Sequence, residues 1–296
     1  MEKLAVNIRV PFCRGNCVHC DGVRCGQNVG YLHRYRRALE REIAAAAEEL
    51  AGYQIGCVHI QGDAFQLLGP GALDDMLKGL RRLLPGQPDT QWVADVMPDE
   101  LSEEFLHVML KRNGLDRLQL QLLTDDARQL RALHGPCTAN IIQGALKRLG
   151  DKPLACLDLV LAAGIPGQGE AELGDTLVRA LQIRPQQVSV LRFHDNRLDA
   201  ARQRAYAEET DWGAYLAVLT QTLQAAGYLR AGTSWTFALP GRLRVECTQQ
   251  ARKWPVMGFG LGAYTAMEGM AYHNTTDYAL YVEHAGELEK IAVLDE

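Results

Sequence analysis

Segments rich in branched and apolar residues alternate with segments of helical periodicity over the first 195 residues of the chain. Six of them have the length and composition of β-strands. They cover residues 4–10, 55–60, 91–96, 118–122, 154–161 and 187–193. Between them, apolar residues recur at the three- and four-residue spacing of one helix face. Repeated strand–helix units predict a parallel sheet covered by helices, because parallel strands need long crossover connections.

A barrel is favoured over an open dinucleotide-binding sheet, because no G-x-G-x-x-G fingerprint opens a helix after the first strand. The alternation stops near Asp195, and the remainder is rich in Gly, Trp and Tyr. We therefore expect an α/β fold: a partial barrel of six strand–helix units over residues 1–195, with a C-terminal extension over residues 196–296 that packs on the barrel and closes its open side. In such a barrel the chemistry lies at the carboxyl ends of the strands. The first four strands end at Pro11, Gly62, Asp95 and Leu123.

The charge balance narrows the range of partners. Lys and Arg number 31 against 36 Asp and Glu, so the net charge is −5 and the chain has no overall attraction to nucleic acid or anionic membrane. No apolar run is long enough to span a membrane, and the N-terminus lacks the core of a signal peptide. We expect a cytoplasmic protein without nucleic-acid or membrane partners. A local basic cluster is interpreted as a solvated helix face. It consists of Arg34, Arg36, Arg37 and Arg41.

Three of the eight cysteines lie within eight residues, directly after the first predicted strand. Cys13, Cys17 and Cys20 have the spacing C-x3-C-x2-C. Three thiolates on a short loop can hold three irons of a [4Fe–4S] cluster and leave the fourth iron open to another ligand. Zinc is the alternative, but structural zinc takes four protein ligands, and only His19 and Cys25 lie close by. The spacing therefore favours iron and sulfur.

Placed after the first strand of a β/α chain, this motif resembles the signature of radical S-adenosylmethionine (SAM) enzymes. The segment VNIRVPFCRGNCVHC is similar to the opening of the oxygen-independent coproporphyrinogen III oxidases and their haem-chaperone relatives. Further segments resemble that group in the same order along the chain, up to about residue 283. They are residues 61–68, 95–98, 164–168, 227–228, 257–264 and 272–274. The chain ends where the C-terminal domain of that group would begin.

The resemblance implies a mechanism and its partners. A [4Fe–4S] cluster on Cys13, Cys17 and Cys20 would bind SAM through its open iron, and a 5′-deoxyadenosyl radical would abstract hydrogen from a substrate. A one-electron donor of the flavodoxin or ferredoxin type is implied, together with a small-molecule or tetrapyrrole substrate. Whether the outcome is of the oxidoreductase or the methyltransferase type stays open.

Six residues are candidates for cofactor contacts, because they match SAM-binding positions of the resembling proteins or end a predicted strand. They are His19, Gly62, Asp63, Asp95, Asp158 and His194. A loop histidine, a loop-capping aspartate and a structural histidine are the respective alternatives for His19, Asp63 and His194. Two cysteines, Cys25 and Cys137, are candidate catalytic thiols, with incidental loop thiols as the alternative. Cys57 and Cys156 lie within predicted strands and are expected to be buried thiols.

Two departures from the resembling proteins fall in the predicted SAM pocket. Their SAM-contacting Gln falls on Leu123 and their SAM-contacting Arg falls on Gly135. The carboxylate of SAM would therefore lose a positively charged partner, unless Arg131, one helical turn earlier, replaces it. The alternative function is therefore a non-catalytic haem-trafficking or scaffold protein that keeps the cluster with a degenerate SAM pocket.

Overall fold

The structure is a computed structural model. It describes residues 1–12, 17–20, 23, 25, 28–62, 65–84, 86, 88–150, 156–242 and 254–294. Six parallel strands confirm the predicted alternation, and each pairs with the next in chain order. They are β1 (Lys3–Arg9), β2 (Gln54–Gln61), β3 (Gln91–Val96), β4 (Arg117–Leu123), β5 (Cys156–Ala163) and β6 (Gln187–Arg192).

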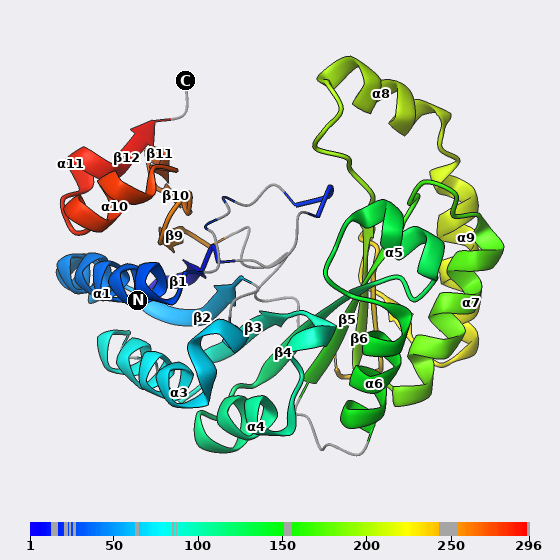
Figure 1. Ribbon diagram of the computed structural model, residues 1–296, viewed down its shortest axis with the longest axis horizontal. Coiled ribbons are helices and arrows are strands. Elements are labelled where there is room, and N and C mark those ends of the chain that lie inside the picture. Colours follow the sequence, from blue (N-terminus) through cyan, green and yellow to red (C-terminus); the bar gives the residue numbers. More distant parts are fainter. Residues whose placement is uncertain are drawn as a thin grey trace.

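Helices connect these strands and, for the most part, cover the convex outer side of the curved sheet (Figure 1). They are α1 (Val29–Ala45), α2 (Ala47–Leu50), α3 (Phe65–Leu83), α4 (Glu103–Leu106), α5 (Ala127–Leu133), α6 (Ala139–Gly150) and α7 (Glu170–Ala180). Two 3₁₀ turns, η1 (Pro98–Glu100) and η3 (Leu181–Ile183), and a π-helical segment, η2 (His107–Arg112), accompany them.

Side-chain alternation along β1 shows how the sheet acquires two different faces. Leu4, Val6 and Ile8 are fully buried and pack in the main core together with Leu39 and Ile43 of α1. Asn7 and Arg9, on the opposite face of the same strand, are partly exposed. The outer face of the sheet is thus the apolar core, and the inner face carries polar groups that line the concave side of the arc.

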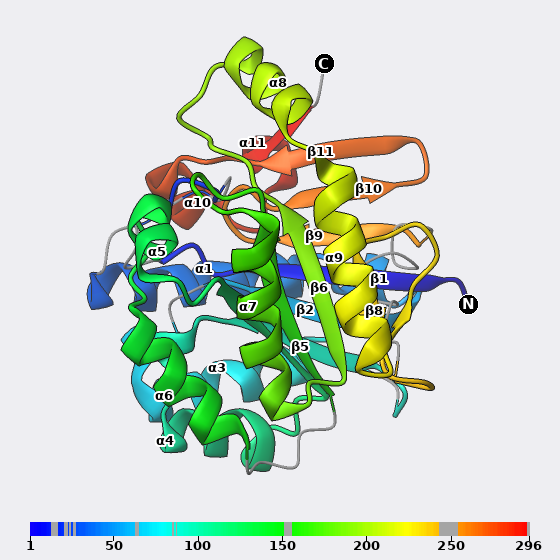
Figure 2. The same ribbon diagram turned by 90° about the vertical axis from the view of Figure 1, so that its right-hand side faces the viewer.

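The C-terminal extension lengthens the sheet at both edges. Its elements are α8 (Ala200–Glu209), α9 (Trp212–Ala225), β7 (Leu229–Arg230), β8 (Thr236–Ala238), β9 (Val256–Phe259), β10 (Tyr264–Met267), β11 (Met270–Asn274), α10 (Tyr278–His284), α11 (Leu288–Ile291) and β12 (Ala292–Leu294). The strand order is β12-β11-β10-β9-β1-β2-β3-β4-β5-β6-β8-β7. Since β12 and β7 are opposite edges, the described sheet is an open arc, as expected for a partial barrel. Figure 2 shows α7 and α9 packed side by side over β5 and β6.

One buried carboxylate fastens α1 to the C-terminal extension. Glu42 accepts hydrogen bonds from Gly260 N (2.8 Å), Asn274 Nδ2 (2.6 Å) and the hydroxyl of Tyr281 (2.6 Å). Burial raises the pKa of Glu42 to about 6, while these three donors act in the opposite direction. The extension therefore packs on the core through specific polar contacts. The domain boundary at residue 195 stays a prediction.

Within the described ranges, none of the helices combines the length and apolar character needed to cross a membrane.

Candidate functional site

The cysteine loop follows β1 at the carboxyl ends of the parallel strands. Cys13 lies outside the described residues, whereas Cys17 is a buried thiol and Cys20 a half-buried one. The N–H of Cys20 points to the carbonyl of Cys17 across a tight turn (3.5 Å). His19, the predicted adenine-side residue, is half-buried between them.

Two segments from distant parts of the chain hold this loop. Val18 N donates to the carbonyl of Leu133, at the end of α5 (3.1 Å), and Asn196 N, in the loop after β6, donates to the carbonyl of Val18 (2.8 Å). The side chain of Val18 packs in a small apolar cluster over the ends of β4, β5 and β6. Its other buried members are Leu123, Leu133, Ala162, Ile165 and Phe193. The cysteine loop is therefore pinned to the rim of the barrel.

Gly62 lies at the end of β2, in close contact with the end of β1. Its φ is +144°, and a Cβ at this position would lie 2.1 Å from the carbonyl oxygen of Val10. Only glycine fits here, because the backbones of the two strand ends approach too closely for a side chain. Gly62 thus shapes the entry into the cysteine loop. The neighbouring candidate Asp63 lies outside the described residues.

Asp95 lies near the end of β3 and is oriented by two neighbours on the inner face of the sheet. His59 Nε2, on β2, is 2.9 Å from Asp95 Oδ1. In the orientation that its neighbours require, the amide of Gln119 donates to the same oxygen (2.9 Å) and accepts from Arg117 Nη2 (3.1 Å). Asp95 keeps 18% of its side-chain surface accessible, so it remains open to a ligand in the barrel.

Asp158 has a different environment from the one predicted. It is fully buried and accepts from Arg117 Nη2 (2.6 Å), Gln187 Nε2 (3.2 Å) and Ser189 Oγ (3.0 Å). Burial raises the pKa of Asp158, and the charge of Arg117 acts against that rise. Asp158 lies in the same cross-strand row as Gln119 and Asp95, so its complete burial, and not its depth in the strand, distinguishes it from Asp95. We do not retain it as a cofactor contact, because Arg117, Gln187 and Ser189 already use its carboxylate.

His194 is exposed after β6, in a cavity of about 600 Å³ that Leu198 and Trp212 also line. Its neighbour Phe193, and not His194, packs against Val18 of the cysteine loop. The sequence analysis selected His194 because it falls on an adenine-contacting position of the resembling proteins, and that role stays a prediction.

The two candidate catalytic cysteines occupy different environments. Cys137 is a buried thiol in the main core. Cys25 is half-buried, its N–H donates to the carbonyl of Pro11 (2.6 Å), and burial raises the pKa of its thiol. Cys57 is buried as predicted, but it takes part in a disulfide instead of remaining a thiol.

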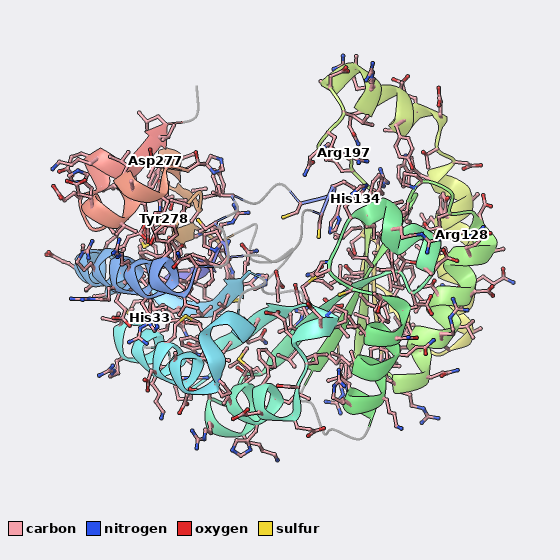
Figure 3. All side chains as sticks on the ribbon, in the orientation of Figure 1. His33, Arg128, His134, Arg197, Asp277 and Tyr278 are labelled. Carbon is pink, nitrogen blue, oxygen red and sulfur yellow. The ribbon has the colours of Figure 1, made fainter. Side chains whose placement is uncertain are left out.

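An arginine that the sequence analysis did not single out lies beside the cysteine loop. Asp195 binds Arg197 through Nε (2.9 Å) and Nη2 (2.6 Å), and Arg197 Nη1 lies 3.4 Å from Nε2 of His134 (Figure 3). The guanidinium holds the pKa of Asp195 below its usual range. His134 is the residue before Gly135, so this cation lies next to one of the two departures described above.

The sequence and the structure were compared with those of known proteins. No model of a known protein family matches the sequence. The chain is 26% identical over 278 residues to the heme chaperone HemW of Escherichia coli (strain K12), a match that covers 89% of this chain and 70% of that protein. It is 23% identical over 188 residues to an oxygen-independent coproporphyrinogen III oxidase of Bradyrhizobium diazoefficiens, covering 63% of this chain and 42% of that protein.

The structure of HemN, the coproporphyrinogen III oxidase of Escherichia coli described as a radical SAM enzyme, matches with a TM-score of 0.79 and 19% identity. The match covers 98% of this chain and 71% of that one. The chain has the fold of this radical SAM enzyme. The resemblance and the partial α/β barrel expected from the sequence are both confirmed. The chain spans less than half of the oxidase relative from Bradyrhizobium.

Within this radical SAM fold, both departures from the resembling proteins contact the cysteine loop. Leu123 has a φ of +58°, uncommon for a bulky residue, and its side chain packs with Val18. A Cβ on Gly135 would lie 3.4 Å from Sγ of Cys17, an ordinary contact distance. The two substitutions therefore change the immediate surroundings of the predicted cluster.

The described donors fit an iron–sulfur cluster. The thiols of Cys17 and Cys20 belong to one short loop and are not in disulfides, and thiolates are the ligands that iron–sulfur clusters take. Cys13 lies outside the described residues, so the complete ligand set stays a prediction.

Proposed function

We propose that the protein is a radical SAM enzyme that holds a [4Fe–4S] cluster on Cys13, Cys17 and Cys20. The observation that carries this proposal is the position of the Cys17 and Cys20 thiols on a loop pinned to the carboxyl-end rim of a partial barrel. When bound, the cluster and SAM would supply a 5′-deoxyadenosyl radical that abstracts hydrogen from a substrate.

The chain's own part is to fix the cysteine loop and to exclude water around it. The two backbone hydrogen bonds of Val18 hold the loop from both sides, and its apolar contacts with Leu123 and Phe193 seal the loop against the barrel. A ligand loop fixed in this way loses little conformational freedom when it binds a cluster.

Asp95 is the acceptor that we propose for a ribose hydroxyl of SAM. Both of its hydrogen bonds, from His59 and Gln119, reach Oδ1. Oδ2 is then the oxygen that accepts from a bound nucleoside, while His59 holds the carboxylate in place. Replacing Asp95 with Ala should weaken SAM binding by about ten- to a hundredfold, the value of a hydrogen bond to a charged group. Asp175→Ala, on the exposed side of α7, is the matched control and should leave it unchanged.

The second candidate is a non-catalytic haem-trafficking or scaffold protein that retains the cluster. Two observations favour it: the similarity to the heme chaperone HemW, and the loss of two predicted SAM-contacting side chains at Leu123 and Gly135.

One assay separates the two functions. The reconstituted protein is reduced anaerobically with dithionite in the presence of SAM, and 5′-deoxyadenosine is quantified by chromatography. The enzyme should release it in multiples of the protein concentration, whereas a Cys17→Ala variant should release none. A reduced, iron-loaded protein that forms no 5′-deoxyadenosine would favour the second candidate.

A further inference from the structure

A cavity of about 650 Å³ opens on the surface where the cysteine loop meets α1 and α10. The loop contributes Val23 and Cys25, α1 contributes Tyr31 and Arg34, and the start of α10 contributes Tyr278. In Figure 3 the start of α10 lies directly above α1. The cavity therefore adjoins the loop of the proposed cluster from outside the barrel, away from the inner face where Asp95 lies.

Aromatic rings connect this cavity to the cysteine motif. The rings of Tyr31, which is 45% exposed, and Tyr278 have centroids 5.0 Å apart. Tyr278 meets the fully buried Phe12 edge to face, with centroids 6.5 Å apart. Phe12 is the residue before Cys13, the first cysteine of the motif. A chain of rings in van der Waals range thus leads from the surface to a proposed cluster ligand. Electron transfer is faster along such a path, because its rate falls less steeply with distance through packed groups than across a gap.

The surface beside the cavity is basic, although the whole chain carries a net charge of −5. Arg34, Arg37 and Arg41 recur at three- and four-residue spacing, so they form one stripe along α1, and all three are exposed. Arg41 also donates to the carbonyl of Val282 on α10 (2.6 Å), which joins the stripe to the second helix of the cavity.

Two acidic groups nearby are engaged by the helices themselves, whereas Glu283, which lines the cavity on α10, is 75% exposed. The carboxylate of Asp277 caps α10 by accepting from Ala279 N (2.8 Å) and Leu280 N (3.0 Å). Glu40 pairs with Arg36 within α1 (3.2 Å). A partner that approaches this surface therefore meets the three exposed arginines of the α1 stripe against the exposed carboxylate of Glu283, and an acidic protein complements this positive balance.

We propose that the α1 stripe and the Tyr31–Tyr278 cavity form the docking surface for an acidic one-electron donor protein of the flavodoxin or ferredoxin class. The inference rests on the proposed function, because it needs a reducible cluster on the cysteine loop. One electron leaves the donor, which is oxidised by one electron, and the [4Fe–4S] cluster gains it. No covalent bond forms or breaks, and no proton moves.

The test uses the reconstituted protein, with flavodoxin as the probe. Arg34→Glu/Arg37→Glu reverses the stripe and changes the net charge from −5 to −9. Arg202→Glu/Arg204→Glu on α8 makes the same change at the opposite end of the arc and is the matched control (Figure 1). Calorimetry measures the affinity for oxidised flavodoxin, which does not require a cluster, and stopped-flow absorbance measures cluster reduction by fully reduced flavodoxin and by dithionite.

The α1 variant should bind flavodoxin at least about tenfold more weakly at low salt, and its cluster should be reduced more slowly by a similar factor, since steering of this kind changes rates by about 10- to 1,000-fold. High salt should remove the difference, and reduction by dithionite should be the same in all three proteins. Equal losses in the α8 control, an unaffected α1 variant, or a wild-type protein that does not bind flavodoxin would overturn the proposal. A cluster that dithionite cannot reduce would instead count against the proposed function, and the binding measurement would still decide the docking surface.

A second pair of variants tests the ring path. Tyr278→Leu removes the ring between Tyr31 and Phe12, and Tyr278→Phe keeps it. At saturating flavodoxin the Leu variant should transfer electrons several-fold more slowly than the Phe variant, with similar affinity and an unchanged rate with dithionite. Equal saturated rates for the two variants would remove the rings from the proposal.

Discussion

Nη1 of Arg197 lies 3.4 Å from Nε2 of His134, and each residue adjoins a backbone hydrogen bond that holds the cysteine loop. His134 follows Leu133, whose carbonyl accepts from Val18, and Arg197 follows Asn196, which donates to Val18. A guanidinium is thus built into the clamp of the loop, next to Gly135. Arg131, the replacement expected from the sequence, is an exposed residue of α5.

We therefore expect Arg197 to supply the positive charge that Gly135 cannot. Arg197→Gln should weaken SAM binding by about ten- to a hundredfold, the value of one charge-assisted hydrogen bond. Arg131→Gln is the matched control and should bind normally. Adding Gly135→Arg to Arg197→Gln should restore part of the affinity, because a Cβ fits at Gly135. Calorimetry measures SAM binding by the reconstituted wild type and these three variants. Equal affinities for Arg197→Gln and Arg131→Gln would contradict the assignment.

The proposed cluster ligands can be tested by iron content. Replacing Cys13, Cys17 or Cys20 with Ala should abolish the brown colour and the expected content of about four irons per chain, because two thiolates do not retain the cubane. Asp175→Ala, on the exposed side of α7, should keep both. Iron analysis after anaerobic reconstitution gives the answer, and full iron content in Cys17→Ala would end the cluster proposal.

Glu42 should make the stability of the fold depend on pH. Its folded-state pKa of about 6 lies above the usual 4.5 because it is buried, so the folded protein binds a proton that the unfolded chain releases. The stabilisation that this bound proton gives the folded state is fully present below pH 4.5 and is lost as the pH rises through 6. Between these two limits the free energy of unfolding changes by about 2 kcal/mol. Urea titrations of the wild type and Glu42→Gln between pH 4.5 and 7.5 measure the free energy of unfolding. This decrease with rising pH should appear only in the wild type.

The buried pair of Arg117 and Asp158 should matter for stability more than for cofactor binding. Arg117→Leu leaves an uncompensated buried carboxylate and should lower the free energy of unfolding by about 3–5 kcal/mol. Arg117→Leu/Asp158→Leu removes both charges and should be less harmful than the single change. Urea unfolding compares the two, and a double variant that is much less stable than the single one would show that the pair has a different role.

The features of this protein that depend on local pattern could be predicted from the sequence. Periodicity gave all six parallel strands within a few residues of their bounds, since period-two and helical patterns differ over short windows. The spacing of the cysteines and their place after β1 predicted a ligand loop at the rim. Gly62 was named as a strand end, and the close approach to Val10 explains why glycine is needed there.

Which of the polar residues contact one another depends on the tertiary structure. Asp158 was a candidate ligand because it lies on a strand of the barrel, and it shares a cross-strand row with Gln119 and Asp95. Its carboxylate is nevertheless fully buried against Arg117, Gln187 and Ser189, whereas Asp95 keeps part of its surface accessible. Arg197 and His134 are 63 residues apart in sequence, so no local pattern could join them. Only the parallel pairing of β4, β5 and β6 brings the loops that follow these strands to the same edge, where they hold the cysteine loop.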